Sequence, residues 1–456
     1  MSCYDCKVSE RFRRAATAGQ GLPAIEPGMP VPAGTGMTRR DFVSRTAGLA
    51  LAVYGGSALS SLALDDGIAK AAADAPAGQK VLVSIFLNGG IDALNVLFPA
   101  GDPAYYSLRP NLAIAQTAGR PFPEDERLRW HPSADGLATL HAEGKVSVLQ
   151  AIGYDNSDKS HFTARHYYEV GQTDVHLRTG WLGRFLDRVG VPDNPVQGLT
   201  LDATLHPSLA TAKVPVATLQ GADQYQFAPP GVAPHPLEAS MLQMAANIGA
   251  AHKKSTDVGL QQAGQTAYDA HRLYYQLGSF RYGITSPVAY PSSSDPFPRR
   301  LAGLAAMIAS GMPVRVVGLT IGRFDTHAGQ PGAFNRDLGL ASASLLAFQR
   351  DLEARGVADR VLVHVWSEFG RRGAENASNG TDHGSAGIGF LIGTKVKGQQ
   401  VGSFPGVTGG LDAQGNLKPS ADFRAVYSAI LEQWLEIDAN EVIPGVQPFK
   451  RPALLK

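Results

Sequence analysis

The stretch VLVHVWSEFGRRGAENASNGTDHGSAGIGFLIG, residues 361–393, holds two apolar runs separated by a polar loop. Short apolar runs that are rich in Val, Ile and Leu and bounded by turn residues are typical of strands buried on both faces of a sheet. The loop between the runs contains titratable side chains, among them Glu368, Arg371, Asp382 and His383. The stretch therefore predicts two buried strands joined by a loop that carries groups suited to chemistry.

The same pattern extends over most of the chain. Apolar runs predict strands at 80–89, 145–153, 196–203, 313–322, 359–368 and 388–393. Helices are predicted at 160–171, 258–280, 299–311, 336–356 and 420–436. Strands that alternate with helices in this way indicate an α/β fold with a mainly parallel sheet.

One helix can be oriented from its sequence. In 336–356 a single stripe carries Leu338, Leu345, Phe348 and Leu352, and Gly356 is a suitable residue to end the helix.

The segment 205–255 has little helical character and is expected to form an excursion over the sheet edge. Residues 284–298 are rich in Pro and Ser and predict a loop.

Composition limits the partners. The chain has 456 residues, 44% of them hydrophobic, with 41 Lys and Arg against 40 Asp and Glu. A balance this even gives no net field to attract nucleic acid or an anionic membrane, so neither is expected as a partner. Protein partners stay open.

The N-terminal part has the pattern of an export signal. Residues 1–36 form a polar tail, and 37–75 contain Arg39-Arg40, a weakly apolar run and small residues that suit cleavage near Ala73 or Ala75. We expect export by the twin-arginine route to the periplasm or cell exterior, no stable membrane span, and a single α/β domain over 76–456. Both cysteines, Cys3 and Cys6, precede the signal, so the mature chain is expected to lack disulfides and thiolate ligands.

Polar side chains recur where the predicted strands end. They are Asp92 after the first strand, Ser160 and Thr163 after the second, Asp325 and His327 after 313–322, Glu368 after 359–368, and Asp382 and His383 before 388–393. Ligands of α/β proteins bind at this edge, and a cation would offset the repulsion among such groups. We expect one or two divalent metal ions here, with Zn, Mn, Ca or Mg as candidates.

Each residue taken alone has a structural alternative. Asp92 could cap a helix, Glu368 could pair with Arg371, and Ser160 is as suitable an N-cap as a nucleophile. His364 lies inside a predicted strand and is expected to be a core histidine and not a ligand.

The motifs SEFGR, TDHG, FDTH, GGIDALN and SHFTARHYYEVG together resemble a bacterial family, catalogued as domain of unknown function fifteen-oh-one, over residues 80–450. The resemblance implies the fold of the alkaline phosphatase and sulfatase superfamily, a three-layer sandwich with metals at the strand ends. It also implies metal ligands among Asp92, Asp325, His327, Glu368, Asp382 and His383, a nucleophile at Ser160 or Thr163, and an oxyanion contact from Arg371 or Arg165.

The expected activity is hydrolysis of phosphate or sulfate esters in an anionic small molecule or polymer, by the Ser or Thr nucleophile or by a metal-activated water. Glu368-Phe369 stands where that superfamily has an Asp-His pair, so one metal site is expected to be weak or missing. The alternatives are a catalytically idle binding or assembly protein that keeps the fold and, with less support, an oxidoreductase. A glycine-rich dinucleotide motif does not follow the first strand, which argues against the oxidoreductase.

Overall fold

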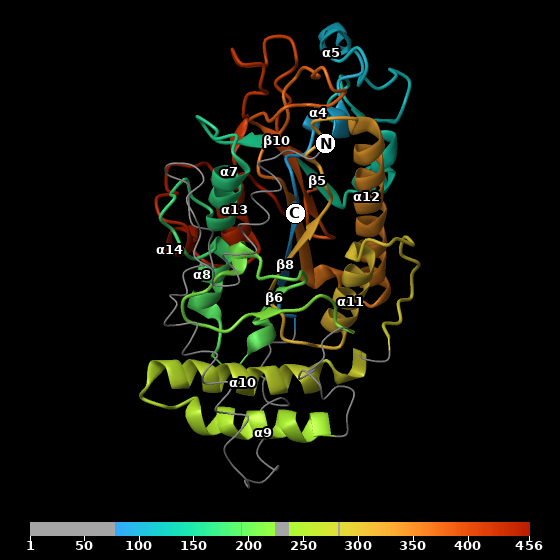
Figure 1. The fold of residues 1–456 in the computed structure, drawn as a ribbon. Coiled ribbons are helices and arrows are strands. Elements are labelled where there is room, and N and C mark those ends of the chain that lie inside the picture. Colours follow the sequence, from blue (N-terminus) through green and yellow to red (C-terminus); the bar gives the residue numbers. More distant parts are fainter. Residues whose placement is uncertain (1–77, 193, 224–236, 281–282) are drawn as a thin grey trace.

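The middle layer of the molecule is a large twisted sheet (Figure 1). The computed structural model describes residues 78–192, 194–223, 237–280 and 283–456, and in them this sheet has nine strands. Their order is β11-β5-β10-β9-β1-β8-β6-β7, with β12 also beside β5. The strands are β1 Val81–Leu87, β5 Val146–Gly153, β6 Gly198–Thr200, β7 Ala217–Thr218, β8 Val316–Ile321, β9 Val361–Trp366, β10 Gly387–Ile392, β11 Gln400–Gly402 and β12 Ala421–Asp422.

All paired strands of this sheet run parallel except β10. β1 pairs in parallel with β8 and β9, whereas β10 is antiparallel to both β5 and β9. Because β10 runs in the opposite direction, its first residue lies at the edge where its neighbours end. The loop before β10 therefore reaches the same edge as the loops that follow β5, β9, β1 and β8.

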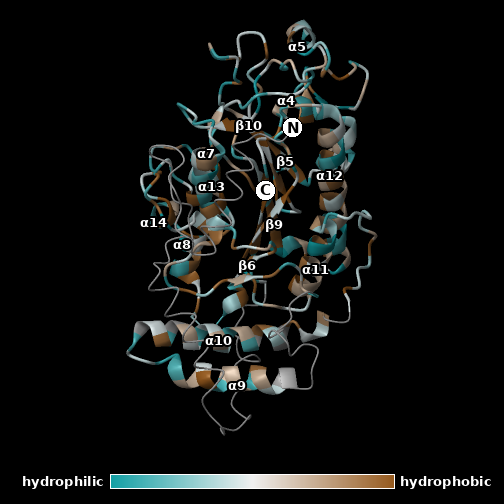
Figure 2. Cartoon of the chain, in the orientation of Figure 1, coloured by the Kyte–Doolittle hydropathy of each residue, from teal (hydrophilic) through white to brown (hydrophobic). Residues whose placement is uncertain are grey.

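Helices cover both faces of the sheet (Figure 1). On one face lie α7 His161–Val170, α8 Trp181–Val189, α13 Phe423–Gln433 and α14 Ala439–Val442, and on the other α6 Asp135–Ala142, α11 Phe297–Ala309 and α12 Gln330–Ala354. Every residue of β1 is buried, with Val83 and Ile85 in one core and Leu82 and Phe86 in the other. Hydrophobic residues accordingly dominate the central strands in Figure 2.

Smaller elements complete the chain. α4 Ala93–Val96 and α5 Pro103–Leu108 lie above the carboxyl edge of the sheet (Figure 1). A short second sheet consists of β2 Leu97–Phe98, β4 Arg129–Trp130 and β3 Arg120–Pro121, in that order. At the opposite end, α9 Leu237–His252 packs along α10 Val258–Gln276. Among the described helices, none combines the length and the apolar character that a membrane crossing requires.

The predicted α/β class, with a mainly parallel sheet between layers of helices, is confirmed. All six predicted strands and all five predicted helices are present, and the stripe that includes Leu338 and Leu345 packs in the core as expected. The helix predicted from 336 begins at Gln330, because Pro331 fits a first helical turn. It ends just before Gly356, whose φ of 70° suits a helix terminus.

The prediction of little helix in 205–255 is wrong, because α9 occupies Leu237–His252. Its low amphipathic contrast hid it, since only a narrow side of α9 is buried, against α10. Helices α6 and α8, the small second sheet and the antiparallel direction of β10 were not predicted. The polar tail, the twin-arginine segment and both cysteines lie outside the described residues.

Candidate metal centre

Three histidines and one aspartate meet at the carboxyl edge of the sheet. Asp325 and His327 follow β8, His383 precedes β10, and His161 is the first residue of α7, which follows β5. Three segments that are distant in sequence therefore each bring one or two side chains to this place. The antiparallel direction of β10 is what allows His383 to join them.

The donor atoms of these side chains converge. His383 Nε2 lies 2.9 Å from the Nε2 atoms of both His161 and His327. Asp325 Oδ1 lies 3.0 Å from His327 Nε2, 3.3 Å from His383 Nε2 and 3.5 Å from His161 Nε2. His161, Asp325 and His383 alone already form a group whose geometry could hold a metal ion.

The other ring nitrogens set the tautomers. His383 Nδ1 donates to the backbone oxygen of Lys159 at 2.8 Å, and His161 Nδ1 donates to Glu368 Oε1 at 2.8 Å. His327 Nδ1 is 3.3 Å from Asp382 Oδ1. A ring that donates Nδ1–H outward can present the lone pair of Nε2 to the cluster when the ring is neutral. Nitrogen atoms 2.9 Å apart need a proton or a cation between them, and the nitrogen and carboxylate donors gathered here fit a metal ion.

The charges around the centre reinforce this fit. Burial alone would raise the pKa of Asp325, but hydrogen bonds with the three histidines and the charge of Arg371 hold that pKa far below its usual range. Burial lowers the pKa of His383, and a hydrogen bond to Asp325 only partly offsets it. The site therefore combines an ionised carboxylate with a neutral imidazole, which are the ligand forms that bind metals.

Glu368 lies behind His161. Its carboxylate is fully buried and accepts hydrogen bonds from the backbone N–H groups of Gly89 (3.1 Å) and Gly90 (3.0 Å). Burial would raise its pKa, but the bond with His161 outweighs this and lowers it. Both oxygens of Glu368 are occupied, so in this arrangement it orients His161 and does not face the donor cluster.

The two glycines that hold Glu368 have backbone conformations that other residues rarely adopt. Their φ values are 113° for Gly89 and 74° for Gly90. A Cβ atom on Gly90 would overlap the ring of Phe369, and one on Gly89 would overlap the backbone of Asp325. Both positions therefore require glycine.

Arg371 is completely buried beside the cluster. One Nη2–H bonds Asp325 Oδ1 at 2.7 Å, and the other N–H groups bond backbone oxygens of Gly89, Gly90, Phe324 and Thr381. Nη1 also lies 3.4 Å from His327 Nε2. Because the N–H groups of Arg371 already contact protein atoms, few remain to bind a substrate.

Asp92 lies apart from the histidines. Its carboxylate forms a paired salt bridge with the buried Arg109 (2.6 and 3.0 Å) and accepts a hydrogen bond from Gln330 Nε2 at 2.6 Å. It occupies the N-cap position of α4 but makes no side-chain cap bond. Gln330 Oε1 in turn accepts bonds from Thr326 and Thr381, so Asp92 is linked to the metal-centre loops through Gln330.

The expected nucleophile and oxyanion residues lie on α7. Ser160 caps this helix by accepting a bond from Phe162 N at 3.2 Å, and it stands between Lys159, which contacts His383, and His161. Thr163 is almost fully buried. Arg165 is one turn after His161; its Nε bonds Glu169 at 2.7 Å and its guanidinium stacks 4.4 Å from the Phe86 ring centre.

The structure thus brings together Asp325, His327 and His383 from the predicted set, with Asp382 and Glu368 one step outside. It adds His161, which the sequence had shown only as a histidine near Ser160. Its position at the start of a helix, directly after a strand end, is the signal that could have identified it. Arg109 and Gln330, which hold Asp92, were also not foreseen.

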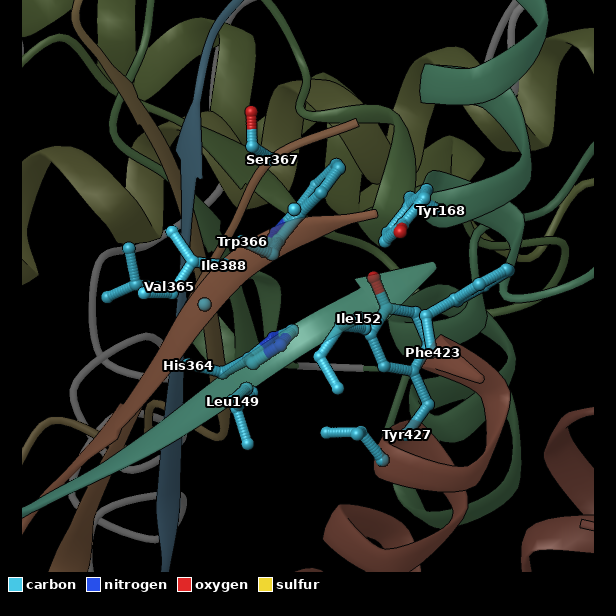
Figure 3. Close-up of a pocket in the computed structure, with 13 residues that line it drawn as sticks. Leu149, Ile152, Tyr168, His364, Val365, Trp366, Ser367, Ile388, Phe423 and Tyr427 are labelled. Carbon is cyan, nitrogen blue, oxygen red and sulfur yellow. The ribbon is translucent and has the colours of Figure 1, made fainter. Parts of the chain in front are cut away.

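A separate pocket lies beneath this edge, where β9 and β10 diverge and α13 covers them (Figure 3). Its lining is mainly apolar and aromatic, including Trp366, Phe423 and Tyr427, and it contains none of the four donor residues. His364 is fully buried there, as expected for a core histidine, and burial lowers its pKa to about 3. His364 Nδ1 and Tyr427 Oη nevertheless lack a hydrogen-bond partner.

Comparison with known families gives one match. The model of the family described as protein of unknown function (DUF1501) matches residues 146–444, which include all four donor residues. A comparison with curated proteins gives no significant match.

Several solved structures are distantly similar. One is a sulfatase from Pseudoalteromonas sp., at 12% identity over 85% of this chain and 75% of that chain, with a TM-score of 0.32. Another is the soluble domain of lipooligosaccharide phosphoethanolamine transferase A from Neisseria meningitidis, at 12% identity, 83% and 96% coverage and a TM-score of 0.35. A lipoteichoic acid synthase from Listeria monocytogenes gives 9% identity, 82% and 78% coverage and a TM-score of 0.32. Because these identities and TM-scores are low, we infer no function for this chain from these structures.

Proposed function

The chain belongs to the family described as protein of unknown function (DUF1501), and for this member we propose an exported, metal-dependent hydrolase of phosphate or sulfate esters. The observation that carries the proposal is the convergence of three imidazole Nε2 atoms on Asp325 Oδ1, with each Nδ1 bound to an outer acceptor. Such a donor set needs a proton or a cation between its nitrogen atoms, and its ligand types match those that hold divalent metal ions. The resemblance to the alkaline phosphatase and sulfatase superfamily supports the choice of ester hydrolysis.

His161, Asp325, His327 and His383 are the proposed ligands. A divalent cation held by them would supply Lewis acidity at an ester oxygen. Glu368 keeps His161 in its tautomer and orientation, and Asp382 does the same for His327. Asp92 is neutralised by Arg109 and has a structural role in this proposal.

Ser160 is the proposed nucleophile in preference to Thr163, because it is less buried and adjoins a ligand. Arg165 is proposed to hold the anionic group of the substrate in preference to Arg371. Arg371 spends its N–H groups on backbone oxygens and Asp325, whereas Arg165 uses Nε for Glu169 and keeps both terminal nitrogens for a ligand. The two terminal nitrogens of a guanidinium form an N–H edge that matches two oxygens of phosphate or sulfate.

Export by the twin-arginine route is part of the proposal and rests on the sequence of residues 37–75. This route carries folded proteins, so the metal could be acquired before export. The substrate would then be an anionic ester, small or polymeric, in the periplasm or outside the cell.

The test is a panel of phosphate and sulfate esters, assayed with and without chelator on wild type and on the His327→Ala, Ser160→Ala, Ser160→Asn and Arg165→Gln variants. We expect chelator-sensitive hydrolysis that is lost in His327→Ala and falls about 100-fold in kcat/KM in Arg165→Gln. Ser160→Asn is the matched control, since Asn caps helices as well as Ser but lacks the hydroxyl.

Loss of hydrolysis in both Ser160 variants would support the nucleophile, and activity retained in Ser160→Asn would assign Ser160 to capping alone. A folded, metal-loaded protein that hydrolyses nothing in the panel would contradict the proposal and favour a binding role.

A further inference from the structure

We infer that this centre takes a single zinc-class ion, and that the Arg371 guanidinium fills the neighbouring position that a second ion would need. This inference rests on the proposed function, and it deepens it by fixing the number and chemical class of the metal. Three observations support it: the distances between the donor atoms, the hydrogen-bond partners of each ligand side chain, and the groups that surround Arg371.

The spacing of the donors fits one small ion. Zinc binds nitrogen and oxygen at about 2.0–2.2 Å, so four tetrahedral donors around it lie about 3.3 to 3.5 Å apart. Five of the six distances among the three Nε2 atoms and Asp325 Oδ1 are 2.9, 2.9, 3.0, 3.3 and 3.5 Å. His161, Asp325 and His383 lie mutually within 4.8 Å and could share one ion, whereas the ring of His327 lies outside that group and would have to shift to join them.

The donor chemistry narrows the class of metal. Three imidazole nitrogens and one carboxylate oxygen suit zinc and similar transition metals. Calcium and magnesium prefer sites made of oxygen ligands, with six or more of them in total. The nitrogen-rich donor set therefore argues against calcium and magnesium, which the sequence alone had left as candidates.

Outer contacts already hold each ligand in its binding form. His161, His327 and His383 use Nδ1 for Glu368, Asp382 and the Lys159 backbone oxygen, respectively. Histidines that ligate metals usually make such a second contact, which fixes the ring and increases its basicity. The site is therefore prepared for one ion before it binds.

Arg371 provides the fixed positive charge beside that ion. It contacts Asp325 Oδ1 and is surrounded by the backbone oxygens of Gly89, Gly90, Phe324 and Thr381. A carboxylate and several carbonyl oxygens could themselves bind a hard cation, but the guanidinium occupies that space.

The other acidic groups nearby also have partners. Asp92 pairs with Arg109, and Glu368 is bound by two backbone amides and His161. Within the described part of this edge, these pairings leave no buried carboxylate free for a second ion. One divalent ion and one guanidinium together supply most, though not all, of the positive charge that two divalent ions would carry.

The experiment is elemental analysis of the purified mature protein, together with replacement of its metal by Co²⁺ and a competition titration against a chromophoric chelator. We expect one zinc per chain after desalting and, with Co²⁺, the intense visible absorption of a four-coordinate ion. His161→Gln should weaken zinc binding at least 100-fold, a loss greater than outer contacts cause. His176→Gln, which changes an exposed histidine elsewhere, should leave affinity unchanged.

Two tightly held ions per chain would overturn this inference and leave the hydrolase proposal intact. One ion with unchanged affinity in His161→Gln would overturn the ligand assignment. A folded protein that binds no zinc and hydrolyses no ester would remove both this inference and the proposed function.

Discussion

At the scale of single residues, Gly90 shows how closely the centre is built. Its N–H bonds Glu368, its carbonyl oxygen accepts from Arg371, and the ring of Phe369 fills the place of a side chain. One residue thus supports both the carboxylate that orients His161 and the cation beside Asp325. A change at Gly90 would disturb both sides of the site together.

We therefore expect Gly90→Ala to lower the free energy of unfolding by about 2 kcal/mol or more, because the methyl group meets Phe369 and the positive φ becomes strained. Zinc affinity should fall as well. Urea unfolding and the chelator competition would measure the two effects. Gly101→Ala is the control, since nothing lies within 4 Å of its added methyl group. Equal behaviour of the two variants would refute this view of Gly90.

At the scale of elements, β9, β10 and α13 enclose the pocket of Figure 3. Tyr427 on α13 is fully buried and its ring lies edge-on to His364 of β9, at 5.4 Å between ring centres. Because Tyr427 Oη has no hydrogen-bond partner, its burial costs free energy that the packing of the ring must offset.

Tyr427→Phe should accordingly leave stability unchanged or raise it by about 1 kcal/mol, since it removes only an unsatisfied hydroxyl. The matched control is Tyr105→Phe. That hydroxyl donates to Asn95 Oδ1 and accepts from Ile114 N, so its removal should cost about 1 kcal/mol or more. Urea unfolding of both variants gives the comparison. Destabilisation by Tyr427→Phe would mean that its hydroxyl has a partner, such as a buried water.

The strands and helices also show how much of the fold the sequence predicts. Continuous apolar runs gave all six predicted strands, because strands buried on both faces must be apolar throughout. Helix α9 was not predicted from the sequence because only a narrow side of it is buried, against α10. No residue pattern within β10 indicates that it runs antiparallel, because its direction is defined only relative to β5 and β9, with which it pairs.

The site was partly predictable for the same physical reason. Asp325, His327 and His383 stand directly beside strand ends, where the fold makes polar residues meet. His161 has a weaker signal, its place at the start of the helix that follows the second predicted strand, several residues beyond the end of β5. The pairing of Asp92 with Arg109, 17 residues later, depends on how α5 folds back, and no spacing in the sequence indicates it.

At the scale of the whole molecule, buried neutral histidines set the response to acid. Burial lowers the pKa of His364 to about 3 and that of His131 to about 4. Both values lie below the ordinary value of about 6.5, so the unfolded chain binds these protons first. Their contribution to stability is present above pH 6.5 and is lost as the pH falls toward the folded values.

We predict that lowering the pH from 6.5 to 5 costs about 2 kcal/mol of unfolding free energy for His364 alone. In His364→Phe this part of the pH dependence should disappear, and the slope between pH 6.5 and 5 should fall by up to one proton. Urea unfolding at a series of pH values would test this. An unchanged slope would show that His364 takes up its proton over the same pH range in the folded and unfolded chains.

The claim on which the whole account depends is that His161, Asp325, His327 and His383 bind one metal ion. A crystal structure of the mature protein grown with zinc, with data collected on both sides of the zinc absorption edge, tests it most directly. We predict a single anomalous peak about 2 Å from the three Nε2 atoms and Asp325 Oδ1. A zinc-soaked crystal with no peak among these four atoms, or with its peak elsewhere, would contradict the account.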